Sequence, residues 1–184
     1  MQVLNNNYNL YVDLSTCIFS MLLLFLLLFS YNKKDYQYKI LCTANICTII
    51  AGISSIIYNT IIFNMKVEIK PIEMIVYITH HLSNIAMICI WVLILLYLYT
   101  IAYYKKMEKT RKRTTIICTA LMIIYTFVEI FGTITKTSFY IKDGIAYEHF
   151  FFNVFNVFYL FYAFCVIFCC IRYRKKFLSY RFES

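Results

Sequence analysis

Five long stretches dominated by apolar residues constrain this 184-residue chain more than any other feature. They cover residues 14–31, 40–65, 74–104, 114–135 and 150–171. A helix needs roughly 20 mostly apolar residues to cross a bilayer, and it pairs its own backbone hydrogen-bonding groups. The stretches are too long to be the strands of a membrane barrel. The sequence therefore predicts an all-α integral membrane protein, with one domain over residues 1–184 built as a bundle of five transmembrane helices.

Lysine and arginine are distributed unevenly between the connections of this predicted bundle. The first connection, the third connection and the C-terminal tail hold most of the 18 basic residues, and the segment before the first helix has none. Short cytoplasmic loops carry the excess of basic residues. We therefore expect the N-terminus outside and the C-terminus in the cytoplasm. The net charge of +9 then reflects orientation and attraction to anionic lipid headgroups at the cytoplasmic face, and no nucleic-acid partner is expected.

All eight cysteines lie within or beside the apolar stretches, and none belongs to a CxxC pair. This pattern indicates small apolar side chains that fill space between helices, with neither a disulfide framework nor a metal site, and no cofactor is expected. Acylation of Cys169 and Cys170, near the basic tail, is an alternative for those two.

The segment "SFYIKDGIAYEHFFF", residues 138–152, has the pattern of a β-hairpin. Asp-Gly between two short runs of alternating apolar residues favours a tight turn with positive φ at one or both turn residues. The segment joins the fourth and fifth predicted helices, so we expect a hairpin on the outer face. It would be either a rigid connector or a cap, whose residues would be Tyr140, Asp143, Gly144 and Tyr147.

Polar residues occur at a similar predicted depth, toward the outer side, on all five helices. They are Asp13, Asn59, His80, His81, Asn84, Glu129, Asn153 and Asn156. Such groups are costly inside a membrane and usually face the bundle interior, a partner or water. We expect Glu129 to face inward, toward His80, His81, Asn84 or water. The set is either a polar cluster that packs helices or a ligand-binding pocket open to the outside. Adjacent histidines on a helix point about 100° apart, so no zinc site is expected.

Several segments together resemble a known class of membrane region. They are "YNKKDYQYKILCTANICTIIAGISSIIYN", "LYLYTIAYYKK", "SFYIKDGIAYEHFFFNVFNVFYLFYAF" and the basic "RYRKK". In spacing and hydropathy they resemble the multi-helix membrane sensor region at the N-terminus of bacterial GGDEF proteins, the diguanylate cyclases. The resemblance implies a multi-pass protein of the bacterial inner membrane. The chain has no GGDEF sequence and no other nucleotide-binding motif, so we do not expect it to be an enzyme.

Two functions therefore remain open at this point. The first is a sensory or regulatory module in the cell membrane that receives a signal at the outer polar residues, with a homodimer or a signalling protein as partner. Ala51 and Ser55, which share a helix face, would serve either packing within the chain or such a dimer. The second function is that of a small structural subunit of a larger membrane complex.

Overall fold

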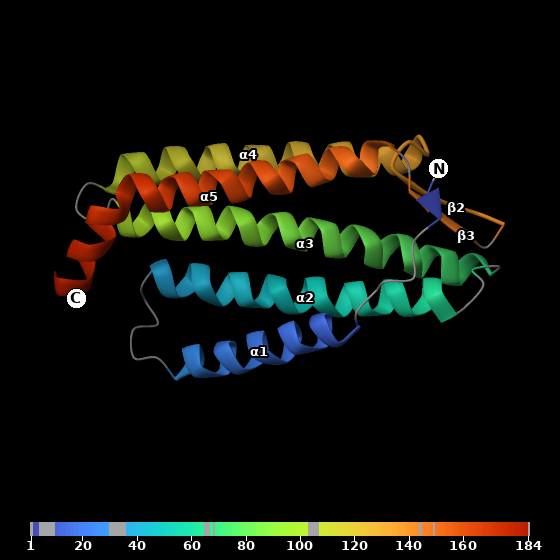
Figure 1. The fold of residues 1–184 in the computed structure, drawn as a ribbon, viewed down its shortest axis with the longest axis horizontal. Helices are drawn as coiled ribbons and strands as arrows, with labels where there is room; N and C mark the ends of the chain where they lie inside the picture. Colours follow the sequence, from blue (N-terminus) through green and yellow to red (C-terminus); the bar gives the residue numbers. More distant parts are fainter. Residues whose placement is uncertain are drawn as a thin grey trace.

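The computed structural model describes residues 2–3, 10–29, 36–64, 67, 69–102, 107–143, 145–148 and 150–183. In this part of the chain five helices lie roughly along one axis (Figure 1). They are α1 (Leu10–Leu28), α2 (Tyr36–Asn64), α3 (Lys70–Ala102), α4 (Met107–Ile134) and α5 (Phe150–Glu183). Each is long and apolar enough to cross a membrane. The predicted set of five long apolar helices is therefore confirmed.

The helix ends differ from the predicted ones because apolar stretches mark only the part of a helix that suits the bilayer. Lysine, arginine and glutamate are good helix formers, so a helix continues through them beyond the hydrocarbon core. Four helices accordingly begin four to seven residues earlier than predicted, and α5 continues to Glu183 instead of ending at residue 171. Pro71 lies in the first turn of α3, where its missing N–H costs nothing.

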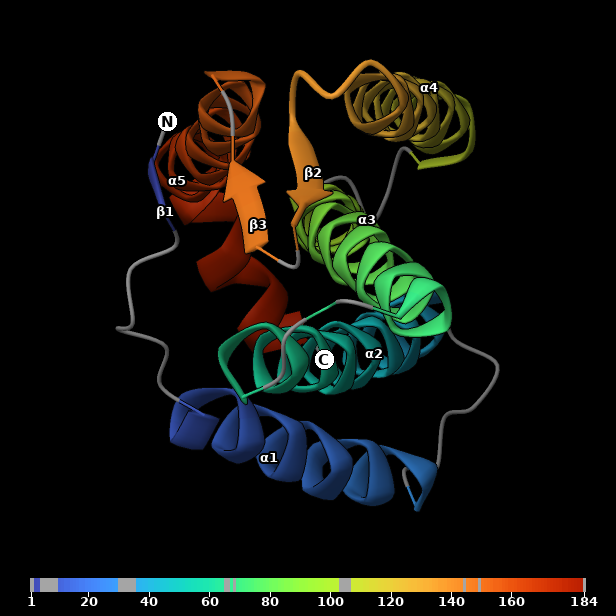
Figure 2. The same ribbon diagram turned by 90° about the vertical axis from the view of Figure 1, so that its right-hand side faces the viewer.

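The third helix is the centre of the bundle. It lies between α2 on one side and α4 with α5 on the other, while α1 packs along the outer side of α2 (Figures 1 and 2). The main core joins α3, α4 and α5, and its buried residues include Ile88, Val92, Leu95, Leu96, Cys118, Tyr125 and Tyr162. The central position of α3 lets it contact three other helices.

Large apolar side chains cover the outward surfaces of the bundle. Phe127 on α4 and Leu160 on α5 are each 70% exposed, and α1 exposes apolar residues along its length. A helix that is apolar all round is typical of a deep core or of a membrane span. These surfaces are therefore explained by lipid as the surrounding solvent, and the fold indicates a multi-pass membrane protein.

The small residues of α2 pack within the chain. Ser83 of α3 donates a hydrogen bond of 3.2 Å to the backbone oxygen of Ala51, which is buried. The next residue of α2, Gly52, lies directly against Cys17 of α1. Small side chains let helix backbones approach closely. This contact explains why the sequence places alanine, glycine and serine together in the middle of α2.

The contact between Gly52 and Cys17 gives a prediction for the docking of α1. A Cβ atom added at Gly52 would overlap Sγ of Cys17. We expect Gly52→Ala to lower the free energy of unfolding by about 1–3 kcal/mol, the usual cost of overpacking, measured by thermal unfolding in detergent. Adding Cys17→Ala should restore stability, because the overlapping sulfur is then gone and alanine favours the helix over glycine. Equal stability of Gly52→Ala and the wild type would contradict this packing.

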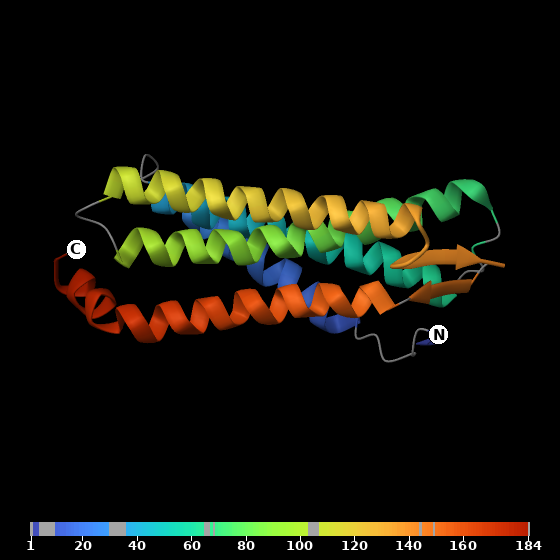
Figure 3. The ribbon, with the colours of Figure 1, turned by 90° about the horizontal axis from the view of Figure 1, so that it is seen from above.

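A small antiparallel sheet lies at one end of the bundle, with strands β1 (Gln2–Val3), β2 (Phe139–Lys142) and β3 (Ile145–Glu148) in the order β1-β3-β2 (Figure 3). Lys142 pairs with Ile145, so two residues connect β2 and β3. The first of them, Asp143, has a φ of 53°. The second, Gly144, lies outside the described residues. The sequence did not predict β1, because two residues carry no periodicity.

The end of α4 directs the chain into β2. Lys136 has a φ of 58°, and the N–H groups of Lys136 and Thr137 donate to the carbonyl oxygens of Thr133 and Gly132 at 3.0 and 2.8 Å. These are the two hydrogen bonds of a Schellman motif, which ends a helix with one left-handed residue. The turn brings Ser138 and Phe139 back over the end of α4, and both are fully buried. Phe139 belongs to a second core, with Tyr58, Val67, Val76 and Ala146.

Candidate functional site

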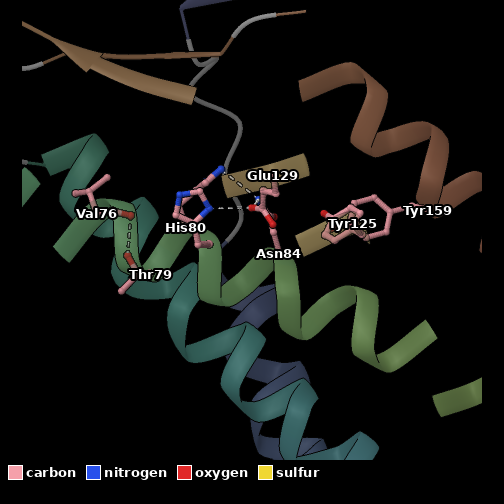
Figure 4. A network of polar contacts seen from close by, with 8 residues as sticks. Val76, Thr79, His80, Asn84, Tyr125, Glu129 and Tyr159 are labelled. Carbon is pink, nitrogen blue, oxygen red and sulfur yellow. Dashed lines mark hydrogen bonds and ion pairs between the residues drawn. The ribbon is translucent and has the colours of Figure 1, made fainter. Parts of the chain in front are cut away.

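A buried polar cluster lies between α3 and α4, next to the sheet (Figure 4). At its centre is Glu129 of α4, which is 0% exposed. Its Oε1 atom accepts a hydrogen bond of 2.8 Å from Nδ2 of Asn84 and lies 3.2 Å from Nδ1 of His81, both on α3. The expectation that Glu129 faces inward, toward polar residues of the third helix, is therefore confirmed.

Asn84 connects Glu129 to the second histidine. Its Nδ2 atom also lies 3.1 Å from Nε2 of His80, one helical turn away on α3. A side-chain amide has two N–H donors, so Asn84 uses one for the carboxylate of Glu129 and the other for the ring nitrogen of His80. A histidine that accepts at Nε2 carries its proton on Nδ1 and is neutral. In this geometry His80 is a neutral acceptor for Asn84.

The ring of His80 joins the cluster to the sheet. It stacks on the ring of Phe139, with 4.3 Å between centroids and 17° between planes, and it lies 5.0 Å from the ring of Tyr58. The N–H of Ile141, in the same strand, donates to the hydroxyl of Tyr77 at 3.0 Å. The polar cluster and β2 are therefore in direct contact through the stacked rings of His80 and Phe139.

His81 is only partly buried, as is Asn84. The side chain of His81 is 20% exposed, whereas that of Glu129 is fully enclosed. When the imidazole is protonated, the pair is an ion pair, and when it is neutral, the pair is a hydrogen bond to a carboxylate. The nature of the contact between His81 and Glu129 thus depends on whether the imidazole is protonated.

The other oxygen of Glu129, Oε2, has no hydrogen-bond partner among the described residues. A buried acceptor without a partner costs about 1–3 kcal/mol, so such atoms are few in folded proteins. Beside it, the hydroxyls of Tyr125 on α4 and Tyr159 on α5 lie 3.2 Å from each other (Figure 4). The polar cluster thus reaches all three helices of the main core.

One face of α4 points into the bundle and includes Glu129. Its buried or half-buried members are Cys118, Met122, Tyr125, Glu129 and Gly132. Their spacing of four, three, four and three residues is a heptad pattern, which keeps side chains on one helix face. Tyr125 was missed in the sequence analysis, and its position one turn before Glu129 on this face was the signal that could have found it.

The other residues predicted for the site are not all brought together. Asn59 donates to the backbone oxygen and to Oγ of Ser55 on its own helix, at 2.9 and 3.2 Å. Asp13 lies on α1, which is on the far side of α2 from α4 (Figure 2). Asn153 and Asn156 are in α5, but their side chains lie outside the described residues.

The cap residues also divide into two groups. The rings of Tyr140 and Tyr147 stack on each other across β2 and β3, with 5.3 Å between centroids. Asp143 follows β2 with a φ of 53°, and Gly144 lies outside the described residues. The residue of this segment that contacts the polar cluster is Phe139, because alternate residues of a strand point to opposite faces.

The fold and the cluster define a class: a protein of five helices that could cross a membrane, with a buried His–Asn–Glu cluster at one end. Within the described residues, no group of three or more His, Cys, Asp or Glu side chains is arranged to hold a metal ion. In comparisons with family models, curated proteins and solved structures, nothing matches this chain. Nothing therefore links it to the sensor regions of GGDEF proteins, and that resemblance stays a proposal.

Proposed function

We propose that this chain is a sensory or regulatory module of the cell membrane, similar to the input region of a diguanylate cyclase, and that the His81–Asn84–Glu129 cluster is its receiving element. The observation that carries the proposal is the carboxyl of Glu129. It is fully buried between helices, its Oε1 is hydrogen-bonded, and its Oε2 has no hydrogen-bond partner in the part of the chain that the structure describes. Ionisable groups inside membrane segments are rare and usually serve a function. A purely structural contact would not require a charge at this position.

The path from the cluster to the other end of the bundle supports a signalling function. Asn84 lies near the middle of α3, and Tyr99, near the end of the helix away from the sheet, contacts Tyr173 of α5, with 6.1 Å between ring centroids. A shift of α3 at the cluster would therefore reach α5 where it continues beyond its apolar part into a basic segment. We propose that this segment faces the cytoplasm and its anionic lipid headgroups, where a homodimer contact or a signalling protein would receive the shift.

The proposed orientation can be tested by labelling. In a variant without native cysteines, Asp143→Cys should react with a membrane-impermeant maleimide in intact cells, because the sheet end would be outside. Lys109→Cys, in the basic first turn of α4, should react only after the membrane is opened. Reaction of residue 109 but not of residue 143 in intact cells would reverse the orientation.

The signalling function predicts a response at the far end of the bundle. We expect a fluorophore attached at Tyr173→Cys, in protein held in lipid nanodiscs, to change its emission when the pH is lowered from about 7.5 to about 5.5. Tyr58, Tyr125, Tyr159, His80, His81 and Glu129 are the titratable groups in and around the cluster. Glu129→Gln should remove the response, because it keeps the side-chain volume and loses the charge.

The matched control is Glu73→Gln, which removes an acidic residue from the first turn of the same helix, α3. This variant should respond as the wild type does. A response that is unchanged by Glu129→Gln would contradict the assigned site. No response in any variant, together with copurification of defined membrane proteins in fixed proportion, would instead favour a structural subunit.

A further inference from the structure

Three buried oxygen atoms without a hydrogen-bond partner occur together at the sheet end of α4. They are Oε2 of Glu129, Oγ1 of Thr133 and Oγ of Ser138, and each lacks a partner in the part of the chain that the structure describes. Glu129 and Ser138 are both 0% exposed. Buried polar atoms without a partner are few in folded proteins. Three of them so close in the sequence indicate that a further molecule completes their hydrogen bonds.

The hydroxyl of Thr133 differs from other threonine hydroxyls of this protein. Oγ1 of Thr126, on the same helix, donates to the carbonyl oxygen of Met122 at 2.9 Å, and Oγ1 of Thr100 on α3 donates to that of Leu96 at 2.8 Å. A threonine in a helix commonly bonds in this way to the carbonyl four residues back. Thr133 makes no such bond to a described residue, so its hydroxyl is available to a group outside its own helix.

The backbone brings Ser138 close to Glu129 and Thr133. These two residues are four apart on α4, so their Cβ atoms are about 5–6 Å from each other. Ser138 follows the Schellman turn, and its N–H donates to the carbonyl oxygen of Gly132 at 3.0 Å. A Cβ atom added at Gly132 would lie 2.9 Å from Cβ and 3.8 Å from Oγ of Ser138. Ser138 therefore lies directly against the turn of α4 that carries Glu129 and Thr133.

We propose that one buried water molecule bridges these three oxygen atoms. The water donates a hydrogen bond to Oε2 of Glu129 and accepts one from each of the hydroxyls of Thr133 and Ser138, which rotate to suit their partner. About three hydrogen bonds are usual for a buried water. Two oxygen atoms bonded to the same water are at most about 5.5 Å apart, a separation that side chains one helical turn apart can meet.

Water fits this set of atoms better than a metal ion does. Ca²⁺ takes about six to eight oxygen ligands and Mg²⁺ about six, whereas one carboxylate oxygen and two hydroxyls provide only half of a six-ligand shell. A buried water needs roughly two to four polar partners, and it adds no charge to an apolar bundle. The chemistry of the three atoms therefore favours a neutral molecule that both donates and accepts hydrogen bonds.

A water at this position completes the surroundings of Glu129. Oε1 is in contact with Asn84 and His81, and the water contacts Oε2. Both oxygen atoms of the carboxyl are then hydrogen-bonded, which removes the cost of a buried acceptor without a partner. The inference rests on the contacts around Gly132 and does not use the proposed sensory function, so the two can fail separately.

Thermal unfolding in detergent tests the bridge through the sign of its effect. Ser138→Ala removes one hydroxyl, and Thr133→Val replaces the other with a methyl group. Each variant should lose a hydrogen bond to the water, and its melting temperature should fall by about 2–4 °C. A hydroxyl without any partner would give the opposite result, because its removal relieves a buried polar group. Since both hydroxyls bind one water, the double variant should fall by less than the sum of the single shifts.

The water can also be counted directly, from the magnetic relaxation of isotope-labelled water, which detects molecules held for long times inside a protein. The double variant Thr133→Val with Ser138→Ala should hold one long-lived water fewer than the wild type. The matched control is Thr126→Val on the same helix. Its hydroxyl already bonds to Met122, so this variant should keep the number of waters found in the wild type.

Three results would overturn the proposal. The first is a melting temperature that rises in both Ser138→Ala and Thr133→Val. The second is an equal number of long-lived waters in the wild type and the double variant, which would assign the hydroxyls to groups of the chain itself. The third is stabilisation of the wild type, but not of the double variant, by sodium chloride and not by choline chloride, which would assign the site to a sodium ion. If circular dichroism shows that the double variant has not folded, Ser138→Ala alone decides the count.

Discussion

Replacing Glu129 with leucine is expected to leave the five helices inserted but to destabilise the folded bundle. The change removes a carboxylate, which costs about 2.5–3.5 kcal/mol near the centre of a membrane helix and less toward its ends. Insertion should therefore be at least as efficient as in the wild type. In the folded state, however, Nδ2 of Asn84 and Nδ1 of His81 lose the atom they contact. Each buried donor left without an acceptor costs about 1–3 kcal/mol.

The destabilisation can be separated from a general packing defect by a double-mutant cycle. Asn84→Leu alone leaves the carboxylate without its closest donor, whose hydrogen bond is 2.8 Å long. When both residues are leucine, neither polar group is stranded, so the double variant should be more stable than the sum of the single effects predicts. We expect a coupling of about 0.5–3 kcal/mol between the two residues, measured from unfolding in detergent.

The comparison of Glu129→Leu with Glu129→Gln also separates the two interpretations of the cluster. Glutamine keeps a carbonyl oxygen that can accept from Asn84, so its stability should be closer to that of the wild type. If the cluster serves packing alone, glutamine should restore all measurable properties. If it receives a signal, glutamine should restore stability but not the pH response at the far end of α5. Additive effects of Glu129→Leu and Asn84→Leu would show that the contact contributes no coupling.

The sequence allowed the depth of the cluster and the residues around Glu129 to be predicted, but not which other polar residues at that depth lie outside the cluster. Depth depends on how far a residue lies along an apolar stretch, which can be counted. Glu129 and Asn84 were placed at one level in this way, and they are in contact. Which residues face each other also depends on how each helix is rotated about its axis, and packing against neighbours determines that rotation. Asn59 was predicted at the same level, yet it bonds to Ser55 on its own helix.

The two histidines also show that the sequence does not determine how a helix is rotated about its axis. Adjacent residues on a helix point about 100° apart, so His80 and His81 had to face different surroundings. The sequence did not indicate which one would approach Glu129. In the structure His81 contacts the carboxyl, while His80 turns toward Phe139 and Tyr58. The difference arises because β2 covers the side of α3 on which His80 lies.

The contact between Cys89 and Met122 was unpredictable for a related reason. The two residues are about 30 residues apart in the sequence and lie on different helices, and no spacing rule connects residues so far apart. Only the packing of α3 against α4 brings their sulfur atoms to within 3.1 Å of each other. The heptad face of α4, by contrast, was available in the sequence, and it would have joined Met122, Tyr125 and Glu129 in one row.

The aromatic contact between the sheet and α3 should have the largest effect on stability. Phe139 is 0% exposed and touches His80, Tyr58 and Tyr77, with ring centroids 4.3, 5.7 and 5.5 Å away. Phe139→Ala removes the ring and leaves a cavity between β2, α2 and α3. We expect the free energy of unfolding in detergent to fall by about 3–5 kcal/mol, as for other buried phenylalanines replaced by alanine.

The matched control for this change is Phe131→Ala on α4. Phe131 is 57% exposed, so its ring faces the surroundings of the bundle and its loss creates no cavity. We expect it to cost far less than Phe139→Ala, and equal losses in the two variants would mean that β2 is not packed on α3. Because the ring of Phe139 also holds His80 in position, Phe139→Ala should loosen the hydrogen bond between His80 and Asn84. The same variant should therefore weaken the coupling between Asn84 and Glu129, which a cavity far from the cluster would leave unchanged.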